Sequence, residues 1–195
     1  MKLDTEGGEF KILQGARKQL QENICGVRCE VSFDYIFDGM PLFSTIHDFM
    51  LGHDFYLLNL DYNGRGDYQN DFVRLDERYG ILTACDAVWM KRPKHVFEQP
   101  SHSHGDTEAR VMKYAAFCLN NNACDVAIDI LLRARREHGL SFDALKGTRL
   151  HKFLDISIHK LFYGLKWQPG QSLKTNQETF SLIFGTKMKE MNEFM

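Results

Sequence analysis

The spacing of apolar residues changes along the chain and divides it into two regions. In residues 1–94, short runs rich in β-forming residues alternate with segments of helical period. From residue 95 onward, the helical period dominates. Alternating strands and helices are typical of an α/β sheet. We therefore predict an α/β domain over 1–94 and an all-helical C-terminal extension over 95–195.

The first region contains two predicted helices that alternate with strands. Strands are predicted at 2–4, 27–33, 56–62 and 81–93. The first helix carries an apolar face and ends between Asn23 and Gly26, and the second lies within 41–55 and stops at Gly52. The apolar face of the first helix is made of Phe10, Leu13, Ala16 and Leu20. This order predicts about four strands, with parallel pairing first and an antiparallel last pair.

The second region carries the i, i+3, i+4, i+7 spacing of amphipathic helices. One helix is predicted within 106–122, with Asp106 or Thr107 as its N-cap, and a second within 123–139, ending at Gly139. Two such helices joined by a short polar turn predict a helical hairpin. Two further helices are predicted at 150–165 and 176–195.

Composition narrows the class of protein. The 195 residues are 44% hydrophobic, and their net charge is −2 without a long block of like charge, so nucleic acid is not an expected partner. Five cysteines without a CxxC pair predict reduced, mostly buried thiols. No basic-then-apolar leader opens the chain, and no apolar run approaches the ~20 residues that cross a bilayer. These features predict a cytoplasmic protein without a membrane span.

Asp4 and Glu6 are the candidate functional residues. Asp4 ends a predicted strand and Glu6 lies in the turn after it, and ligands of parallel α/β sheets bind outside the carboxyl ends of strands. There, a carboxylate can accept a hydrogen bond from a substrate hydroxyl or take its proton as a general base. Alternatively, Glu6 and Glu9 only favour a helix N-terminus, and Gly7 only serves the turn. The residues alone leave both interpretations open.

The stretch 2–20 resembles the signature of the FkbM-type family of S-adenosylmethionine-dependent methyltransferases. The family pattern is Lys-hydrophobic-Asp, then x-Glu-Gly-x-Glu, then Leu-x-Gly-Ala on a helix. The matching residues here are Lys2, Leu3, Asp4, Glu6, Gly7, Glu9, Leu13, Gly15 and Ala16. Glu30 and Asp86 fall in segments similar to later strands of the family. The resemblance implies methyl transfer to a hydroxyl oxygen on a sugar or secondary metabolite, with Asp4 and Glu6 as catalytic residues.

The resemblance covers only the C-terminal half of the family's domain. In the family, three strands and the glycine-rich turn that holds the cofactor precede the matched motif, so the chain is expected to be N-terminally incomplete and inactive in isolation. We therefore expect the isolated chain to bind S-adenosylmethionine weakly or not at all. Calorimetric titration tests this expectation, and micromolar affinity would contradict it. The strand at 2–4 is also expected to lie at an exposed sheet edge, through which the chain could self-associate.

Other polar residues give weaker signals. His102, His104 and Asp106 could be metal ligands, but three such residues without further spaced partners are more typical of a solvated loop, so no metal site is predicted. Asp86 lies within a predicted strand and needs a partner, such as Arg74 or Lys91.

A second hypothesis comes from another class of function. The chain could be a non-catalytic module whose helices bind a partner, with the sheet kept as a degenerate methyltransferase scaffold. An in-frame upstream reading frame that ends in a glycine-rich strand and turn would favour the enzyme.

Overall fold

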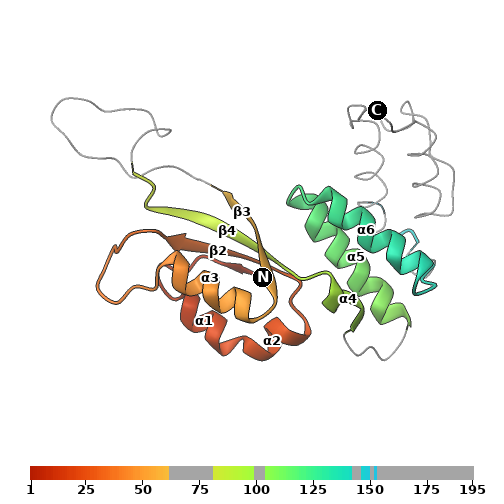
Figure 1. Ribbon diagram of the computed structural model, residues 1–195, viewed down its shortest axis with the longest axis horizontal. Helices are drawn as coiled ribbons and strands as arrows, with labels where there is room; N and C mark the ends of the chain where they lie inside the picture. Colours follow the sequence, from red (N-terminus) through yellow and green to blue (C-terminus); the bar gives the residue numbers. More distant parts are fainter. Residues whose placement is uncertain (62–80, 99–103, 142–145, 150–151, 153–195) are drawn as a thin grey trace. The chain divides into compact units, whose positions relative to one another are not determined.

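A computed structural model describes residues 1–61, 81–98, 104–141, 146–149 and 152 (Figure 1). The chain divides into two compact units, Met1–Arg92 and Pro93–Met195. Each unit is described by itself below.

The first unit is built on a four-stranded mixed sheet. The strands are β1 (Lys2–Leu3), β2 (Gly26–Ser32), β3 (Phe55–Asp61) and β4 (Ala84–Lys91), in the order β1-β2-β4-β3. β1 pairs with β2 in parallel, and β4 is antiparallel to both β2 and β3. The predicted α/β class, the parallel first pair and the antiparallel last pair are thus confirmed. β1 lies at one edge of the sheet, as predicted, and self-association through this edge stays a prediction.

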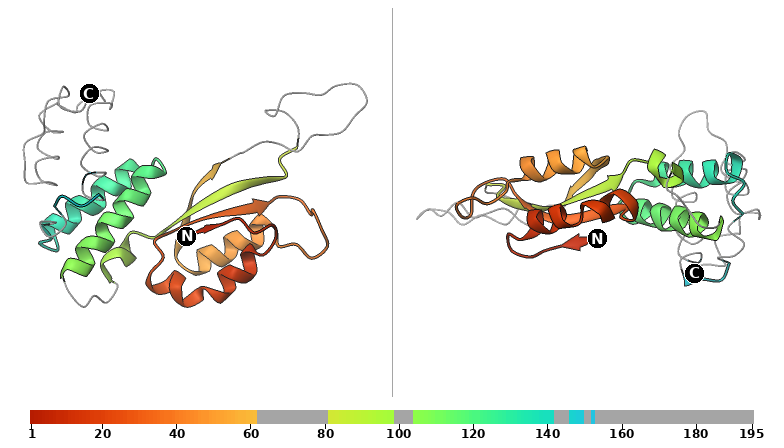
Figure 2. Two further views of the ribbon diagram at one scale, coloured as in Figure 1. Left: turned by 180° about the vertical axis from the view of Figure 1, so that it is seen from behind. Right: turned by 90° about the horizontal axis from the view of Figure 1, so that it is seen from below.

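Three helices connect the strands and pack on one face of the sheet (Figure 2). They are α1 (Glu9–Gly15), α2 (Arg17–Glu22) and α3 (Phe43–Gly52). The strand residues in this core alternate along the sequence, as residues on one face of a sheet must. The buried core comprises Leu13 and Leu20, Ile46 and Met50 of the helices, Leu3 of β1, Val27, Cys29 and Val31 of β2, Phe55 of β3, and Cys85, Ala87 and Trp89 of β4.

The first predicted helix is interrupted. Apolar periodicity predicted one helix, but Ala16 adopts φ −90° and ψ 9° and separates α1 from α2. Gly15, the last residue of α1, lowers the cost of such a break, because glycine stabilises a helix less than alanine does. Leu13 and Leu20 remain fully buried on either side. The predicted apolar face is therefore preserved across the break.

Lys91 joins the ends of two helices to the sheet. Its Nζ donates to the carbonyl of Leu20 at 3.0 Å and to that of His53 at 2.6 Å. The side chain is buried, and burial lowers the pKa of its ammonium group despite the opposing effect of Asp54. Lys91 therefore satisfies two carbonyls where α2 and α3 end.

We predict that Lys91→Met lowers the free energy of unfolding by about 2 kcal/mol, because two carbonyls lose a charged donor. Lys18→Met, at an exposed position of α2, is the matched control and should change it little. Urea unfolding followed by Trp89 fluorescence in a Trp167→Phe background measures both. Equal midpoints for the two variants would show that these hydrogen bonds do not stabilise the fold.

The second unit is helical where it is described. It contains α4 (Lys94–Glu98), α5 (His104–Asn120) and α6 (Cys124–Arg136), and α5 packs against α6 as the predicted hairpin. The N-cap prediction is wrong, because α5 already includes Asp106 and Thr107. Gly139 has φ +63°, a conformation typical of residues that follow a helix. The helices predicted at 150–165 and 176–195 lie outside the described residues, apart from Lys152.

The cysteines are thiols, as predicted. Burial, followed by the charge of Glu9, raises the pKa of Cys29 to about 12. Burial, followed by the charge of Asp86, raises the pKa of Cys85 to about 11. Both thiols are therefore poor nucleophiles at neutral pH. Separately, no helix in the described part of the chain is long and apolar enough to cross a membrane.

Candidate functional site

The turn between β1 and α1 has an unusual backbone. Glu6 has φ +56° and Gly7 has φ +106°. A positive φ is unfavourable for a residue with a side chain, so Glu6 is strained. Gly7 could not be replaced without strain, and a Cβ there would lie 2.7 Å from Cζ of Phe37. The turn is therefore tight in its backbone and closely covered by Phe37.

The carboxylate of Glu9 holds this turn in place. It accepts hydrogen bonds from the Thr5 N–H at 2.5 Å, the Thr5 hydroxyl at 2.8 Å and the Gly7 N–H at 2.9 Å. Burial alone would raise the pKa of Glu9, but hydrogen bonds from its own backbone, Thr5 and Gly7 lower it overall. Glu9 is 5% exposed. Its contacts assign it to the support of the turn, a question that the sequence left open.

Asp4 and Glu6 are exposed and lie close to a third carboxylate, that of Glu30. One carboxylate oxygen from each residue lies within 4.8 Å of the other two. The parallel register explains the proximity: Leu3 is paired with Cys29, so the next residues, Asp4 and Glu30, lie side by side. The two predicted residues therefore share one acidic cluster at the carboxyl end of β1.

The three carboxylates repel one another. Burial raises the pKa of Glu30, and the charges of Glu6, Asp4, Glu9 and Asp86 raise it further. Ionised Glu30 therefore destabilises the folded state. This cost is absent below the unfolded pKa near 4.5 and fully present above the raised folded pKa.

We predict that Glu30→Gln stabilises the fold at neutral pH by less than about 1 kcal/mol, since solvent screens a half-buried group. The gain should disappear as pH falls below 4.5, where Glu30 is protonated in both folded and unfolded chains. Thermal unfolding at several pH values measures it. A variant less stable than the parent at neutral pH would contradict the predicted repulsion.

A small pocket lies beside the cluster. Its walls come from the turn, the end of β2, the following loop and helices α1 and α3: Gly7, Glu9, Phe10, Glu30, Val31, Ser32, Met40, Pro41 and Ile46. Its volume of about 10 Å³ is on the order of one water molecule. The pocket is too small for S-adenosylmethionine, so these residues do not by themselves form a cofactor site.

Asp86 has a partner that the sequence did not suggest. Its carboxylate binds Arg28 Nε at 2.9 Å, and Arg28 Nη1 binds Asp61 at 2.9 Å. Hydrogen bonding and charge from Asp86, together with Asp61, raise the pKa of Arg28 against the effect of burial. Lys91 lies on the opposite face and binds carbonyls, and Arg74 lies outside the described residues. The cross-strand pairing of β2 with β4 brings Arg28 to Asp86.

The histidines of α3 and its C-cap make hydrogen bonds within the first unit. Trp89 Nε1 donates to His47 Nδ1 at 3.2 Å, and His53 Nδ1 lies 2.8 Å from the Phe49 carbonyl. His102 lies outside the described residues, as does the side chain of His104. The hypothesis of a metal site there stays untested.

The sheet order, the parallel β1–β2 pair and the acidic turn at its carboxyl end are consistent with a Rossmann-like methyltransferase fold. More particularly, residues 1–62 match the family described as the methyltransferase FkbM domain, which confirms the resemblance for this part of the chain. No curated protein and no solved structure matches the chain. The match ends before β4, so only the place of β4 between β2 and β3 assigns this strand to the same sheet.

Sequence reasoning placed Asp4 and Glu6 correctly at the end of a strand but did not include Glu30 in the site. Its position in the second predicted strand was known. The missing information was the register of β1 against β2, which decides whether Glu30 lies beside Asp4.

Proposed function

We propose that residues 1–62 form the acceptor side of an S-adenosylmethionine-dependent methyltransferase that modifies a hydroxyl on a sugar or secondary metabolite. The observation that carries the proposal is the position of Asp4 and Glu6: two exposed carboxylates at the carboxyl end of a parallel strand, beside Glu30. The family match supports the reaction class.

The proposed chemistry of the turn follows from its atoms. An ionised carboxylate only accepts hydrogen bonds, so Asp4 or Glu6 would bind an acceptor through the hydrogen of its hydroxyl. As the oxygen gains a methyl group it must lose this proton, and a carboxylate within hydrogen-bond distance can take it. Backbone strain at Glu6 supports a functional role, because such strain clusters at active sites.

The cofactor assignment depends on the family match rather than on a pocket in the described residues. S-adenosylmethionine would supply the methyl group. In the family pattern its binding turn precedes the matched motif, so the activity test uses a chain extended with those strands.

The test is transfer of the tritiated methyl group of S-adenosylmethionine to a panel of hydroxyl, amine and thiol compounds. We expect the extended chain to label at least one hydroxyl compound. Labelling only of amines or thiols would contradict the proposed oxygen acceptor, and failure across the panel with cofactor bound would contradict the reaction class.

Two earlier expectations stay predictions. The first is a cytoplasmic location. The second is the alternative function, in which the helices of the second unit bind a partner without catalysis.

A further inference from the structure

A short apolar segment is exposed beside the acidic turn. Tyr35 and Ile36 are each 66% exposed, and Phe37 is 47% exposed. These residues lie in the connection between β2 and α3, which projects beyond the ends of both elements (Figure 1). Consecutive large apolar side chains at a surface commonly mark a binding site.

The segment is held in place by its own turn and by the acidic turn. The Tyr35 N–H donates to Asp34 Oδ1 at 2.8 Å, and the Met40 N–H donates to the Phe37 carbonyl at 3.3 Å. The Phe37 ring packs over Gly7, where a Cβ would approach within 2.7 Å. Phe37 therefore connects the apolar segment to the turn that carries Glu6.

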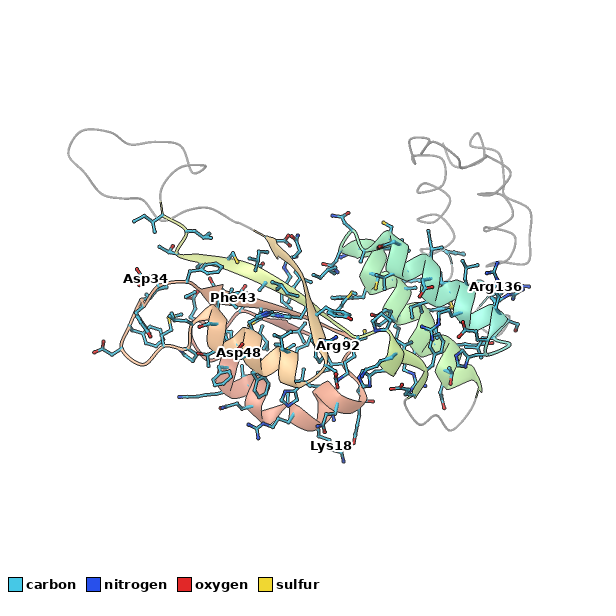
Figure 3. All side chains as sticks on the ribbon, in the orientation of Figure 1. Lys18, Asp34, Phe43, Asp48, Arg92 and Arg136 are labelled. Carbon is cyan, nitrogen blue, oxygen red and sulfur yellow. The ribbon has the colours of Figure 1, made fainter. Side chains whose placement is uncertain are left out.

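Acidic residues surround the apolar segment. Asp34, labelled in Figure 3, and Asp38 flank it and are exposed. Asp4 and Glu6 lie at the adjacent turn, with Glu30 of β2 beside them, and Lys2 pairs with Asp4 at 3.2 Å. The surface thus combines apolar contact area with an excess of negative charge.

We propose that Tyr35, Ile36 and Phe37 bind the apolar part of the methyl acceptor, and that this acceptor also carries a positively charged amine. The inference rests on the proposed function for the role of its ligand. An anionic ligand would be repelled by the surrounding carboxylates, and a purely apolar ligand would desolvate them without giving them a partner. An ammonium group gives carboxylates a charge-assisted donor and is also attracted to the aromatic rings.

Binding of three small fluorinated probes tests the proposal without any methyl transfer. The probes are 4-fluorophenethylamine, 2-(4-fluorophenyl)ethanol and 4-fluorophenylacetate, which share a ring and differ in charge. Fluorine NMR relaxation measures their binding to the full chain. We expect the amine to bind at least about tenfold more tightly than the alcohol, and the acetate more weakly still.

The Tyr35→Ser, Ile36→Ser double variant should weaken amine binding at least about tenfold. Both side chains are largely exposed, so the fold should persist, which circular dichroism checks. The matched control is Leu51→Ser on α3, where an exposed apolar residue is removed away from the segment. Unchanged amine binding in the double variant, or equal binding of amine and alcohol, would overturn the proposal.

This outcome is independent of the proposed reaction. Selective amine binding by a protein that transfers no methyl group would leave the binding surface in place and remove the methyltransferase assignment. Methyl transfer to hydroxyl compounds without selective amine binding would support the methyltransferase assignment and remove the proposed binding surface.

Discussion

Glu9→Ala is expected to lower the free energy of unfolding of the first unit by about 3 kcal/mol. The Glu9 carboxylate accepts hydrogen bonds from the Thr5 and Gly7 N–H groups and the Thr5 hydroxyl. Alanine would leave these donors without their acceptor in a turn that already contains two residues with positive φ. Urea unfolding followed by Trp89 fluorescence in the Trp167→Phe background measures the loss.

The control is Glu22→Ala, which removes an exposed carboxylate from α2 and should have little effect. Glu9→Gln is expected to fall between the parent and Glu9→Ala, because its amide keeps one acceptor oxygen. If Glu9→Ala were as stable as Glu22→Ala, the turn would not depend on Glu9.

The effect of Glu9 should also depend on pH in a defined direction. Its folded pKa lies below the ordinary value of 4.5, so ionised Glu9 stabilises the folded state. This stabilisation is fully present above the unfolded pKa and is lost as pH falls through the folded pKa. The difference in stability between the parent and Glu9→Gln should therefore shrink below pH 4.5.

Asp4→Asn or Glu6→Gln is expected to lower methyl transfer by about 100-fold, equivalent to about 2.7 kcal/mol of transition-state stabilisation. Each amide keeps the size of the side chain but cannot take a proton from a hydroxyl. Both residues are exposed, so the fold should be unaffected. The measurement is turnover of the extended chain, with a hydroxyl compound that accepts the tritiated methyl group.

Matched controls separate charge from location. Asp48→Asn and Glu22→Gln remove exposed carboxylates from α3 and α2, away from the turn, and should leave turnover unchanged. The alternative interpretation, in which the acids only favour a helix N-terminus, predicts lower stability with normal turnover. Normal turnover in Asp4→Asn and Glu6→Gln would therefore remove the catalytic assignment.

Local sequence signals were sufficient to predict the order and type of elements in the first unit, apart from the break between α1 and α2. Strand-forming runs and helical periods placed β1, β2, α3, β3 and β4 close to their observed positions. They also placed Asp4 and Glu6 at the carboxyl end of a strand. These features depend on residues within a few positions of one another.

Features that depend on strand pairing could not be predicted in the same way. Arg28 meets Asp86 although 58 positions separate them, because β4 inserts between β2 and β3. Glu30 joins Asp4 and Glu6 through the register of a two-residue strand. The role of Glu9 depends on positive φ angles at Glu6 and Gly7, and helical periodicity carries no information about such a turn.

The most direct test of the acceptor-side assignment compares cofactor binding with turnover in Glu6→Gln. In the extended chain, calorimetry measures the Kd for S-adenosylmethionine, and tritium transfer measures turnover. We expect an unchanged Kd together with turnover lowered by about 100-fold, because Glu6 is proposed to contact the acceptor and not the cofactor. A Kd that rises in proportion to the loss of turnover would contradict the account and assign the turn to cofactor binding.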